Sequence, residues 1–189
     1  MPRKKRTEPE AMTGSVAESA SAAIVSESES TGEYLEVGLG QVIVFMVDRQ
    51  RYALPIEAVQ EIQQIVEYTS VSGTAAALVG MIDLRGTVVP LIDLRLLLAM
   101  PAAPYRLDTP LVFAHVGGRL VAYLVDEVDD VVDLTGIPLQ APSRLYTISE
   151  RLIGVARLNN GLLFVLDSQR LVPEDALASV DDLVQGWER

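Results

Sequence analysis

The stretch that decides the fold runs Gly80-Met81-Ile82-Asp83-Leu84-Arg85-Gly86-Thr87-Val88-Val89-Pro90-Leu91-Ile92-Asp93-Leu94-Arg95. Its apolar residues fall into two short runs, and the second run is rich in the β-branched residues that favour strands. Arg85-Gly86 stands between the runs, where glycine can adopt the positive φ that a tight turn requires. The stretch therefore predicts two strands joined at one corner. Pro90 cannot donate to a sheet, which predicts an edge or a bulge at that point.

Three charged residues, Asp83, Arg85 and Asp93, interrupt this apolar block. Charged side chains are rarely buried without a partner, so each is expected to point to solvent from the polar side of its strand. Arg85 sits at the corner, where a side chain projects well. A second interpretation is that an acidic partner holds Arg85 on a surface that binds another molecule.

The charge balance argues against several function classes. The chain carries a net charge of −11 and its only lysines are Lys4 and Lys5, so the folded part lacks the clustered cations that nucleic-acid binding requires. The same charge argues against docking on an anionic membrane surface, and no apolar run is long enough for direct membrane insertion. Because there is no cysteine, neither a disulfide framework nor a thiolate zinc site is expected, which fits a cytoplasmic protein.

The composition divides the chain into three parts. Residues 1–37 are rich in Ser, Glu and Ala without an apolar period, which predicts a disordered tail. The basic start at residues 3–6 is interpreted as a solvated terminus, with contact to nucleic acid or lipid as the alternative. Residues 38–172 are expected to form the folded domain. Residues 173–189 predict a short C-terminal helix, because their apolar residues recur at helical spacing.

Short apolar runs separated by turns fill the folded domain. Hairpins are predicted at 42–54, 111–125 and 152–166, and further strands at 60–66 and 126–134. A short helix is expected at 56–59, and three prolines mark 100–110 as a linker. The predicted fold class is all-β, with about ten strands in two groups on either side of the linker. We interpret these groups as two small barrels side by side.

The sequence carries no recognisable catalytic set, so neither an enzyme activity nor a cofactor is predicted. His115 is the only histidine and lies within an apolar run, which excludes a site built on a pair of histidines. The densest charged cluster comprises Asp126, Glu127, Asp129, Asp130 and Asp133. We interpret this acidic cluster as a solvated edge strand that resists pairing with other strands, the alternative being a site for a hard cation such as calcium.

The central stretch resembles the signature of the CheW family of bacterial chemotaxis adaptor proteins. In that family a Gly is followed by Asn-Leu-Arg-Gly, a hydrophobic run with Pro, and Asp-Leu-Arg, and residues 80–95 match this order. Tyr52–Ile62 resembles the family's second strand, Val125–Val128 its Val-Asp-x-Val motif, and Gly154–Leu166 its last hairpin. The resemblance covers residues 38–172. Asp83 departs from the family's Asn, and its carboxylate is able to compete for Arg85.

The resemblance implies two SH3-like five-stranded β-barrel subdomains and a non-enzymatic coupling role. Its implied partners are the regulatory domain of a CheA-type histidine kinase, at one end of the first barrel, and the tip of a methyl-accepting chemoreceptor, in an apolar groove between the barrels. The protein would be cytoplasmic and recruited to membrane-associated receptor arrays. By matched position, the implied partner-binding residues are Ile56, Val59, Glu61, Gly80 and Arg85, with Asp83 beside them. Glu61 and Arg85 are expected to form an ion pair.

Three other interpretations stay open at this point. A related adaptor that serves another chemosensory output, such as pilus motility or gene regulation, would have the same fold. A small-barrel enzyme or metal-binding protein would use the acids at 126–133 and would bind a cation. A nucleic-acid-binding barrel would bind in a salt-sensitive way, but the net charge of −11 and the 5% aromatic content argue against it.

Overall fold

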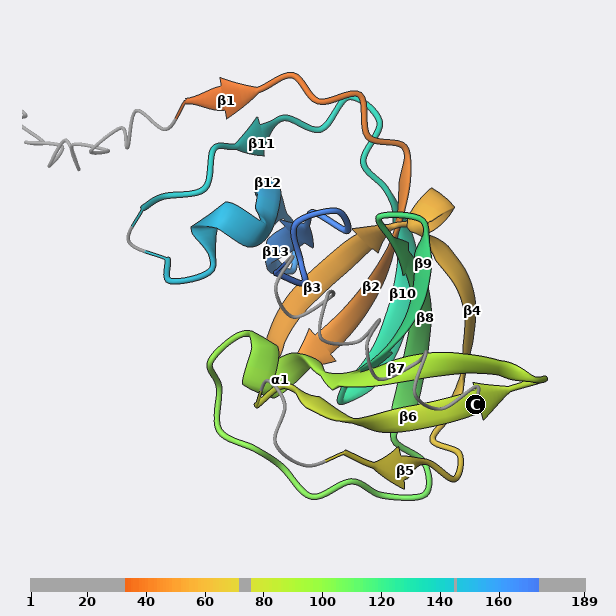
Figure 1. Ribbon diagram of the computed structural model, residues 1–189. Coiled ribbons are helices and arrows are strands. Elements are labelled where there is room, and N and C mark those ends of the chain that lie inside the picture. The colour runs from red at the N-terminus through yellow and green to blue at the C-terminus, as the bar shows by residue number, and fades with distance from the viewer. Residues whose placement is uncertain (1–32, 72–75, 145, 174–189) are drawn as a thin grey trace, which may run out of the picture. The chain divides into compact units, whose positions relative to one another are not determined.

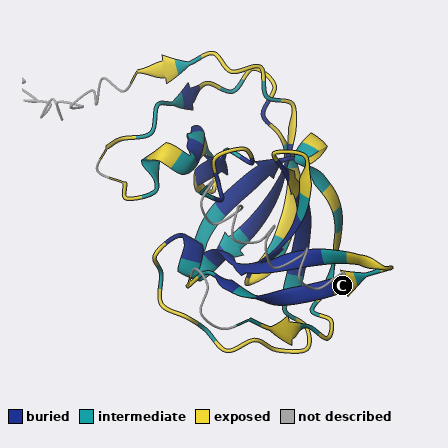
Figure 2. Cartoon of the chain, in the orientation of Figure 1, coloured by how far each residue is buried: buried dark blue, intermediate teal, exposed yellow. Residues whose placement is uncertain are grey.

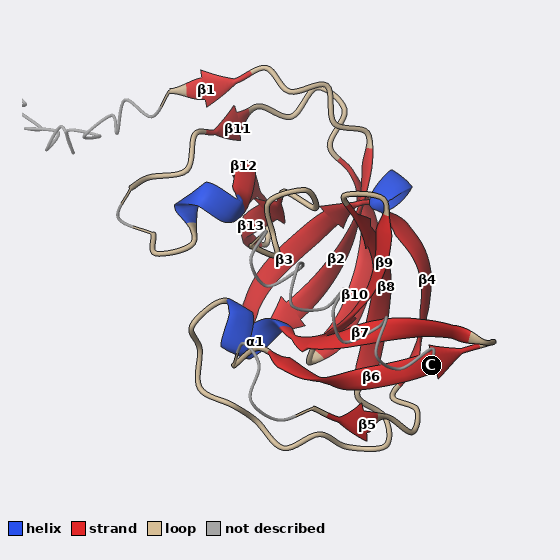
Figure 3. Cartoon of the chain, viewed as in Figure 1, coloured by secondary structure: helices blue, strands red, loops and turns tan. Residues whose placement is uncertain are grey.

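The computed structural model describes residues 33–71, 76–144 and 146–173, which lie within one compact unit. Strands dominate this part of the chain, and its helices are single turns (Figure 1 and Figure 3). The predicted all-β class is confirmed. The predicted C-terminal helix lies almost entirely outside the described residues, as does most of the predicted tail.

One sheet, here called sheet A, has seven strands in the order β1-β11-β12-β13-β3-β2-β10. All of its neighbouring strands are antiparallel except β13 and β3, which are parallel. The strands of sheet A are β1 (Tyr34–Leu35), β2 (Gln41–Val47), β3 (Gln50–Pro55), β10 (Glu127–Asp133), β11 (Leu139–Gln140), β12 (Leu152–Leu158) and β13 (Gly161–Leu166).

The other sheet, sheet B, has six strands in the order β4-β8-β9-β7-β6-β5, and its one parallel pair is β7 with β9. The strands of sheet B are β4 (Val59–Gln64), β5 (Thr69–Ser70), β6 (Leu78–Leu84), β7 (Thr87–Asp93), β8 (Pro110–Val116) and β9 (Arg119–Leu124). Three helical turns complete the described elements: η1 (Ile56–Ala58), α1 (Leu94–Leu97) and η2 (Ser149–Arg151).

The two sheets exchange hairpins between the two halves of the chain. Hairpin β2–β3 from the first half pairs with β10 and β13, whereas hairpin β8–β9 from the second half pairs with β4 and β7. The expected division at the linker 100–110 is therefore wrong, because each sheet contains strands from both sides of it. When the two-residue strands are left aside, each sheet keeps five strands, in agreement with the two five-stranded subdomains that the resemblance implied.

The two halves repeat the same strand pattern at constant spacings. Val59 lies opposite Ala114, and Phe45 lies opposite Val128. A shift of 69 turns Val59 into Val128 and Phe45 into Ala114, so the two pairs are equivalent. The same shift relates the irregularities that follow these pairs, between Val59 and Glu61 in β4 and between Val128 and Val131 in β10. The hairpins β6–β7 and β12–β13 are related by a shift of 74, which places Gly80 at 154. The described chain is thus a structural repeat with swapped hairpins.

Three apolar clusters hold the sheets together. Figure 2 shows that buried residues concentrate on the strands of the two sheets. The largest cluster joins both sheets and includes Phe45, Leu54 and Phe164 from sheet A with Val112 and Tyr123 from sheet B. The other two each lie within one sheet, around Val44 in sheet A and around Phe113 in sheet B. Because the apolar residues on one face of each sheet converge on its own cluster, each sheet curls, as the predicted pair of small barrels requires.

Several local predictions are corrected by the structure. Tyr34–Leu35 forms β1 and pairs with β11, so strand structure begins before the predicted boundary at residue 37. Asp93 is not on a polar face: it is only 1% exposed and accepts hydrogen bonds from the Leu96 N–H (3.2 Å) and the Tyr105 hydroxyl (2.6 Å). β7 is an interior strand, but its pairing with β9 begins only at the residue after Pro90.

Glycine at two equivalent positions lets a short strand approach closely. A Cβ on Gly80 would lie 2.6 Å from both the Thr69 carbonyl oxygen and the Tyr68 ring, and one on Gly154 would lie 2.8 Å from the Leu139 Cβ. Such distances are far below van der Waals contact. Gly80 therefore allows β5 to pair with β6, and Gly154 allows β11 to pair with β12.

We expect Gly80→Ala to destabilise the domain by about 1–3 kcal/mol, because the added methyl group must push β5 away from β6. Chemical denaturation of the full chain measures this change. Gly40→Ala is the matched control, since nothing lies within 4 Å of a Cβ at that position. Equal stability of the two variants would contradict the close-approach role.

An ion cluster bridges the two sheets beside the apolar core. Arg95, in α1, donates to both carboxylate oxygens of Asp126 (2.8 and 2.6 Å) and lies 3.3 Å from Asp48. The backbone N–H of Asp48 donates to the same Asp126 carboxylate at 2.7 Å. Burial acts to raise the pKa of Asp126, but the hydrogen bonds from Arg95 and Asp48 outweigh it and hold that pKa below its usual range. The cluster joins the β2–β3 turn of sheet A to α1, which directly follows β7 of sheet B.

We expect Arg95→Ala to lower the free energy of unfolding by about 2 kcal/mol, as is usual for a lost hydrogen-bonded charge that is largely shielded from solvent. Arg106→Ala is the control, because Arg106 and Asp108 form an exposed pair whose loss should change the free energy of unfolding much less. The pKa of Asp126 is depressed in the folded state. Its contribution to the free energy of unfolding is therefore present above the unfolded carboxyl pKa of about 4 and is lost as the pH falls through the folded-state pKa. In Asp126→Asn the free energy of unfolding should lose this dependence on pH in the acidic range. If the variant and the wild type lose stability with falling pH to the same extent, Asp126 does not stabilise the fold in this way.

Candidate functional site

The corner between β6 and β7 is a tight turn with an unusual backbone. Both of its central residues have positive φ, 55° for Arg85 and 85° for Gly86, as in the type I′ turns that suit hairpins. The Gly86 N–H donates to Asp83 Oδ1 at 2.7 Å, which ties the turn to the end of β6. The turn therefore projects the Arg85 side chain into solvent, where 83% of it is exposed.

The predicted ion pair between Glu61 and Arg85 is confirmed. Arg85 Nη2 lies 3.6 Å from Glu61 Oε2, which joins the β6–β7 turn to the edge strand β4. Glu61 is only 28% exposed, and its other carboxylate oxygen is buried without a hydrogen-bond partner among the described residues. Asp83 does not compete for Arg85 here, because its carboxylate is bonded to the turn instead. An exposed pair of this kind contributes about 0–1 kcal/mol, so it orients Arg85 more than it stabilises the fold.

The other predicted site residues differ in how far they are exposed. Ile56, in η1, is exposed, and Val59 is half-buried and packs against the cluster that joins the two sheets. They lie just before Glu61 on the chain, at the point where the backbone passes from β3 into β4. Gly80 is buried beneath β5 and is not on the surface, so its role is packing. The structure thus brings Glu61, Asp83 and Arg85 together and leaves Gly80 as their support.

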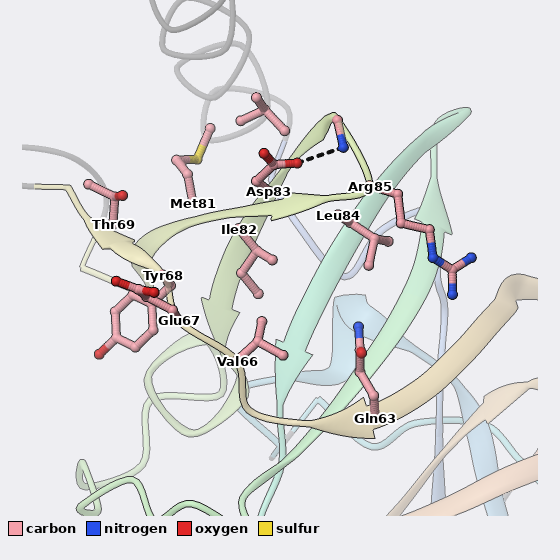
Figure 4. Close-up of a pocket in the computed structure, with 12 residues that line it drawn as sticks. Gln63, Val66, Glu67, Tyr68, Thr69, Met81, Ile82, Asp83, Leu84 and Arg85 are labelled. Carbon is pink, nitrogen blue, oxygen red and sulfur yellow. Dashed lines mark hydrogen bonds between the residues drawn. The ribbon is translucent and has the colours of Figure 1, made fainter.

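A groove of about 740 Å³ lies beside the ion pair (Figure 4). Its volume is in the range of natural binding sites. Arg85 and Gln63 lie at one end of the groove and Tyr68 and Thr69 at the other (Figure 4). Val66 and the β6 residues between Met81 and Leu84 supply apolar surface between these ends. The groove is therefore amphipathic, with the exposed, ion-paired Arg85 at one end.

The sequence did not single out Gln63, although it lies two residues from Glu61 and so on the same side of β4. Its Nε2 atom is buried and has no hydrogen-bond partner among the described residues. Most buried polar groups in proteins are satisfied, so each exception calls for a reason. Glu61 and Gln63 thus leave one acceptor and one donor without a partner beneath the surface on which Arg85 is exposed.

Catalytic and metal-binding alternatives find little geometric support in the described residues. His115 is exposed on β8, and its Nε2 lies 3.0 Å from Gln60 Oε1. No group of three or more His, Cys, Asp or Glu side chains is close enough to hold a metal ion in 33–71, 76–144 and 146–173. The acidic side chains of β10 instead have separate partners. Asp129 forms an ion pair with Arg51, and Asp130 accepts a hydrogen bond from the backbone N–H of Val131. Within the same residues, no helix is long and apolar enough to cross a membrane.

We expect Asp83→Ala to cost about 1 kcal/mol in the free energy of unfolding, because the Gly86 N–H loses its acceptor. Asp83→Asn should stay within about 0.5 kcal/mol of the wild type, because the amide oxygen can accept the same hydrogen bond. Thermal or chemical denaturation separates the two outcomes. If Asn is as destabilising as Ala, the negative charge of Asp83 matters rather than its acceptor.

Two curled five-stranded sheets that exchange hairpins, with a charged turn beside an amphipathic groove, define a two-barrel all-β protein with a surface site. Residues 41–176 match the CheW-like domain family, so the chain belongs to that family. It is 31% identical over 147 residues to the chemotaxis protein CheW of Klebsiella aerogenes, covering 77% of this chain and 89% of that protein. It is 29% identical over 147 residues to the chemotaxis protein CheW of Bacillus subtilis, covering 76% and 94%.

A solved structure agrees with the fold. The crystal structure of the scaffolding protein TtCheW from Thermoanaerobacter tengcongensis superposes with a TM-score of 0.64 and 23% sequence identity, over 70% of this chain and 91% of that chain. At this identity the likeness concerns the fold. It supports the two-subdomain architecture that the hairpin exchange and the three apolar clusters describe.

Proposed function

We propose that this protein is a non-enzymatic chemosensory adaptor that couples chemoreceptors to a CheA-type histidine kinase. The observation that carries the proposal is the exposed Arg85, held by Glu61 beside two unsatisfied polar atoms in a protein of the CheW-like family. The ion pair with Glu61 restricts the Arg85 guanidinium while most of the side chain stays exposed, so part of its conformational entropy is already lost before a partner binds. Relatives that carry the name chemotaxis protein CheW support the signalling context.

The chemoreceptor tip is the partner that we assign to the surface around Ile56, Val59, Glu61, Asp83 and Arg85. An amphipathic helix binds through apolar residues on one face and polar residues beside them. Ile56 and Val59 supply the apolar part and the exposed Arg85 supplies the polar part. The regulatory domain of the kinase would then bind one end of a barrel elsewhere on the surface. Such a protein works in the cytoplasm at receptor arrays.

We expect Arg85→Glu to weaken binding of the receptor tip at least tenfold, which corresponds to about 1.4 kcal/mol. The new carboxylate would lie beside Glu61 and repel it, so both the exposed cation and its orientation would be lost. Isothermal titration calorimetry with the helical tip of a methyl-accepting chemoreceptor from the same cell measures the change.

Arg106→Glu is the matched control, because Arg106 is also exposed and also paired with a carboxylate, but it lies outside the groove. It should bind like the wild type. Circular dichroism melts establish that both variants are folded before they are compared. Equal affinity of Arg85→Glu and the wild type would contradict the assignment of this surface.

A further inference from the structure

The structural repeat allows two sheet edges to be compared position by position. β4 is an edge of sheet B and β10 is an edge of sheet A, and a shift of 69 relates them. Among the described residues, β4 pairs only with β8 and β10 pairs only with β2. Edge strands expose unpaired backbone groups to which another strand can bind, so proteins usually protect them.

The hydrogen bonds at the ends of both strands show which backbone groups point outward. The Ile65 N–H donates inward to the Thr109 carbonyl (2.8 Å), and the equivalent Leu134 N–H donates to the Gly40 carbonyl (3.0 Å). Backbone groups alternate in direction along a strand. The N–H groups of Ile62 and Gln64 in β4 therefore point away from β8, as does that of Val131 in β10.

The β10 edge is protected by its own aspartates. Asp130 Oδ1 accepts the outward N–H of Val131 at 2.7 Å, and Asp133 Oδ1 accepts that of Thr135 at 2.8 Å. Asp129 adds a further exposed carboxylate. Val131 is 45% exposed, yet a strand that approached it would meet these charges and would find donors already occupied. The sequence prediction of an acidic edge that resists pairing agrees with this arrangement.

The equivalent edge of β4 lacks both kinds of protection. Glu61 takes the place of Asp130, but its carboxylate faces Arg85, and Gln64 takes the place of Asp133. In the part of the chain that the structure describes, no side chain accepts the N–H of Ile62 or Val66. Ile62 is 40% exposed on this edge. Apart from the Glu61–Arg85 ion pair, this edge strand is uncharged. It is partly apolar, and the outward N–H groups of Ile62 and Val66 have no side-chain acceptor among the described residues.

We propose that the β4 edge binds an extended segment of a partner protein by strand addition, with β-branched or aromatic residues at alternate positions and basic residues at its ends. The alternate residues would pack on Ile62 and Val66 while the backbone pairs with the outward groups of β4. The basic ends follow from Glu57 and Glu67, which are exposed on either side of the edge, and from the net charge of −11. This inference does not rest on the adaptor function.

A second copy of this chain is a poorer occupant. Two molecules of net charge −11 repel each other. An antiparallel pair of β4 strands centred on Ile62 would also bring Glu57 of one copy toward Glu67 of the other, which places like charges across the interface. A cationic segment avoids both costs.

The test uses the full-length protein and a capped, fluorescently labelled peptide of sequence Arg-Thr-Val-Thr-Val-Thr-Val-Arg. We expect saturable binding by fluorescence anisotropy, and slower amide hydrogen exchange at Ile62, Gln64 and Val66. Ile62→Lys should weaken binding at least tenfold. Val131→Lys is the matched control at the equivalent position of β10 and should leave binding unchanged. A peptide N-methylated at the residues that pair with β4 should not bind, since it cannot donate to the sheet.

Absence of binding at millimolar peptide would overturn the proposal, as would equal binding of the N-methylated peptide. Equal losses in Ile62→Lys and Val131→Lys would also overturn it, because strand addition is specific to one edge. If Ile62→Lys does not fold, the N-methylated peptide and the amide protection pattern decide. A dimer of the free protein that Ile62→Lys dissociates would replace the partner segment with a second copy.

Discussion

The exchange of hairpins between the two halves of the chain is the constraint on which the rest of the structure depends. Hairpin β2–β3 completes sheet A and hairpin β8–β9 completes sheet B, so neither half can bury its own apolar strands alone. The crossing brings Phe45 and Tyr123 into one cluster between the sheets, and Arg95 bridges Asp126 and Asp48 beside it. Each crossover also delivers an edge strand, β4 or β10, to the opposite sheet. The surface around Glu61 and Arg85 therefore has a rigid support.

Within this repeated frame, small changes of side chain separate the two barrels. The β6–β7 turn carries Arg85 into solvent, whereas Asn160, in the equivalent β12–β13 turn, accepts a hydrogen bond from Arg51 within sheet A. At the edges, Asp130 satisfies its neighbouring backbone N–H, while the equivalent Glu61 turns to Arg85. One barrel thus keeps an open edge and an exposed cation, whereas the equivalent turn and edge of the other barrel hydrogen-bond to side chains of their own sheet. Interaction surfaces can be placed on one copy of a repeat without altering the backbone.

Much of this fold could be predicted from apolar runs and turn residues. The corner at Arg85-Gly86 and the hairpin at Gly117-Gly118 depend on local conformation, which local sequence reports. The hairpin exchange could not be predicted, because period-2 patterns say which residues pair within a sheet but not which distant strand is the partner. The burial of Asp93 was missed for the same reason, since its partner Tyr105 lies in a loop that looked like a linker. The Glu61–Arg85 pair came from family resemblance, whereas the role of Gln63 and the contrast between β4 and β10 depend on long-range contacts that only the folded structure shows.

Coupling requires that one molecule hold the kinase and the receptor at the same time through different surfaces. Sedimentation velocity on a mixture of the full-length protein, the regulatory domain of a CheA-type kinase and a receptor tip from the same cell tests this directly. At concentrations above both dissociation constants, we expect a species with the summed mass of all three components. Mixtures that contain only binary complexes at every ratio, with one partner displacing the other, would contradict the proposed coupling role.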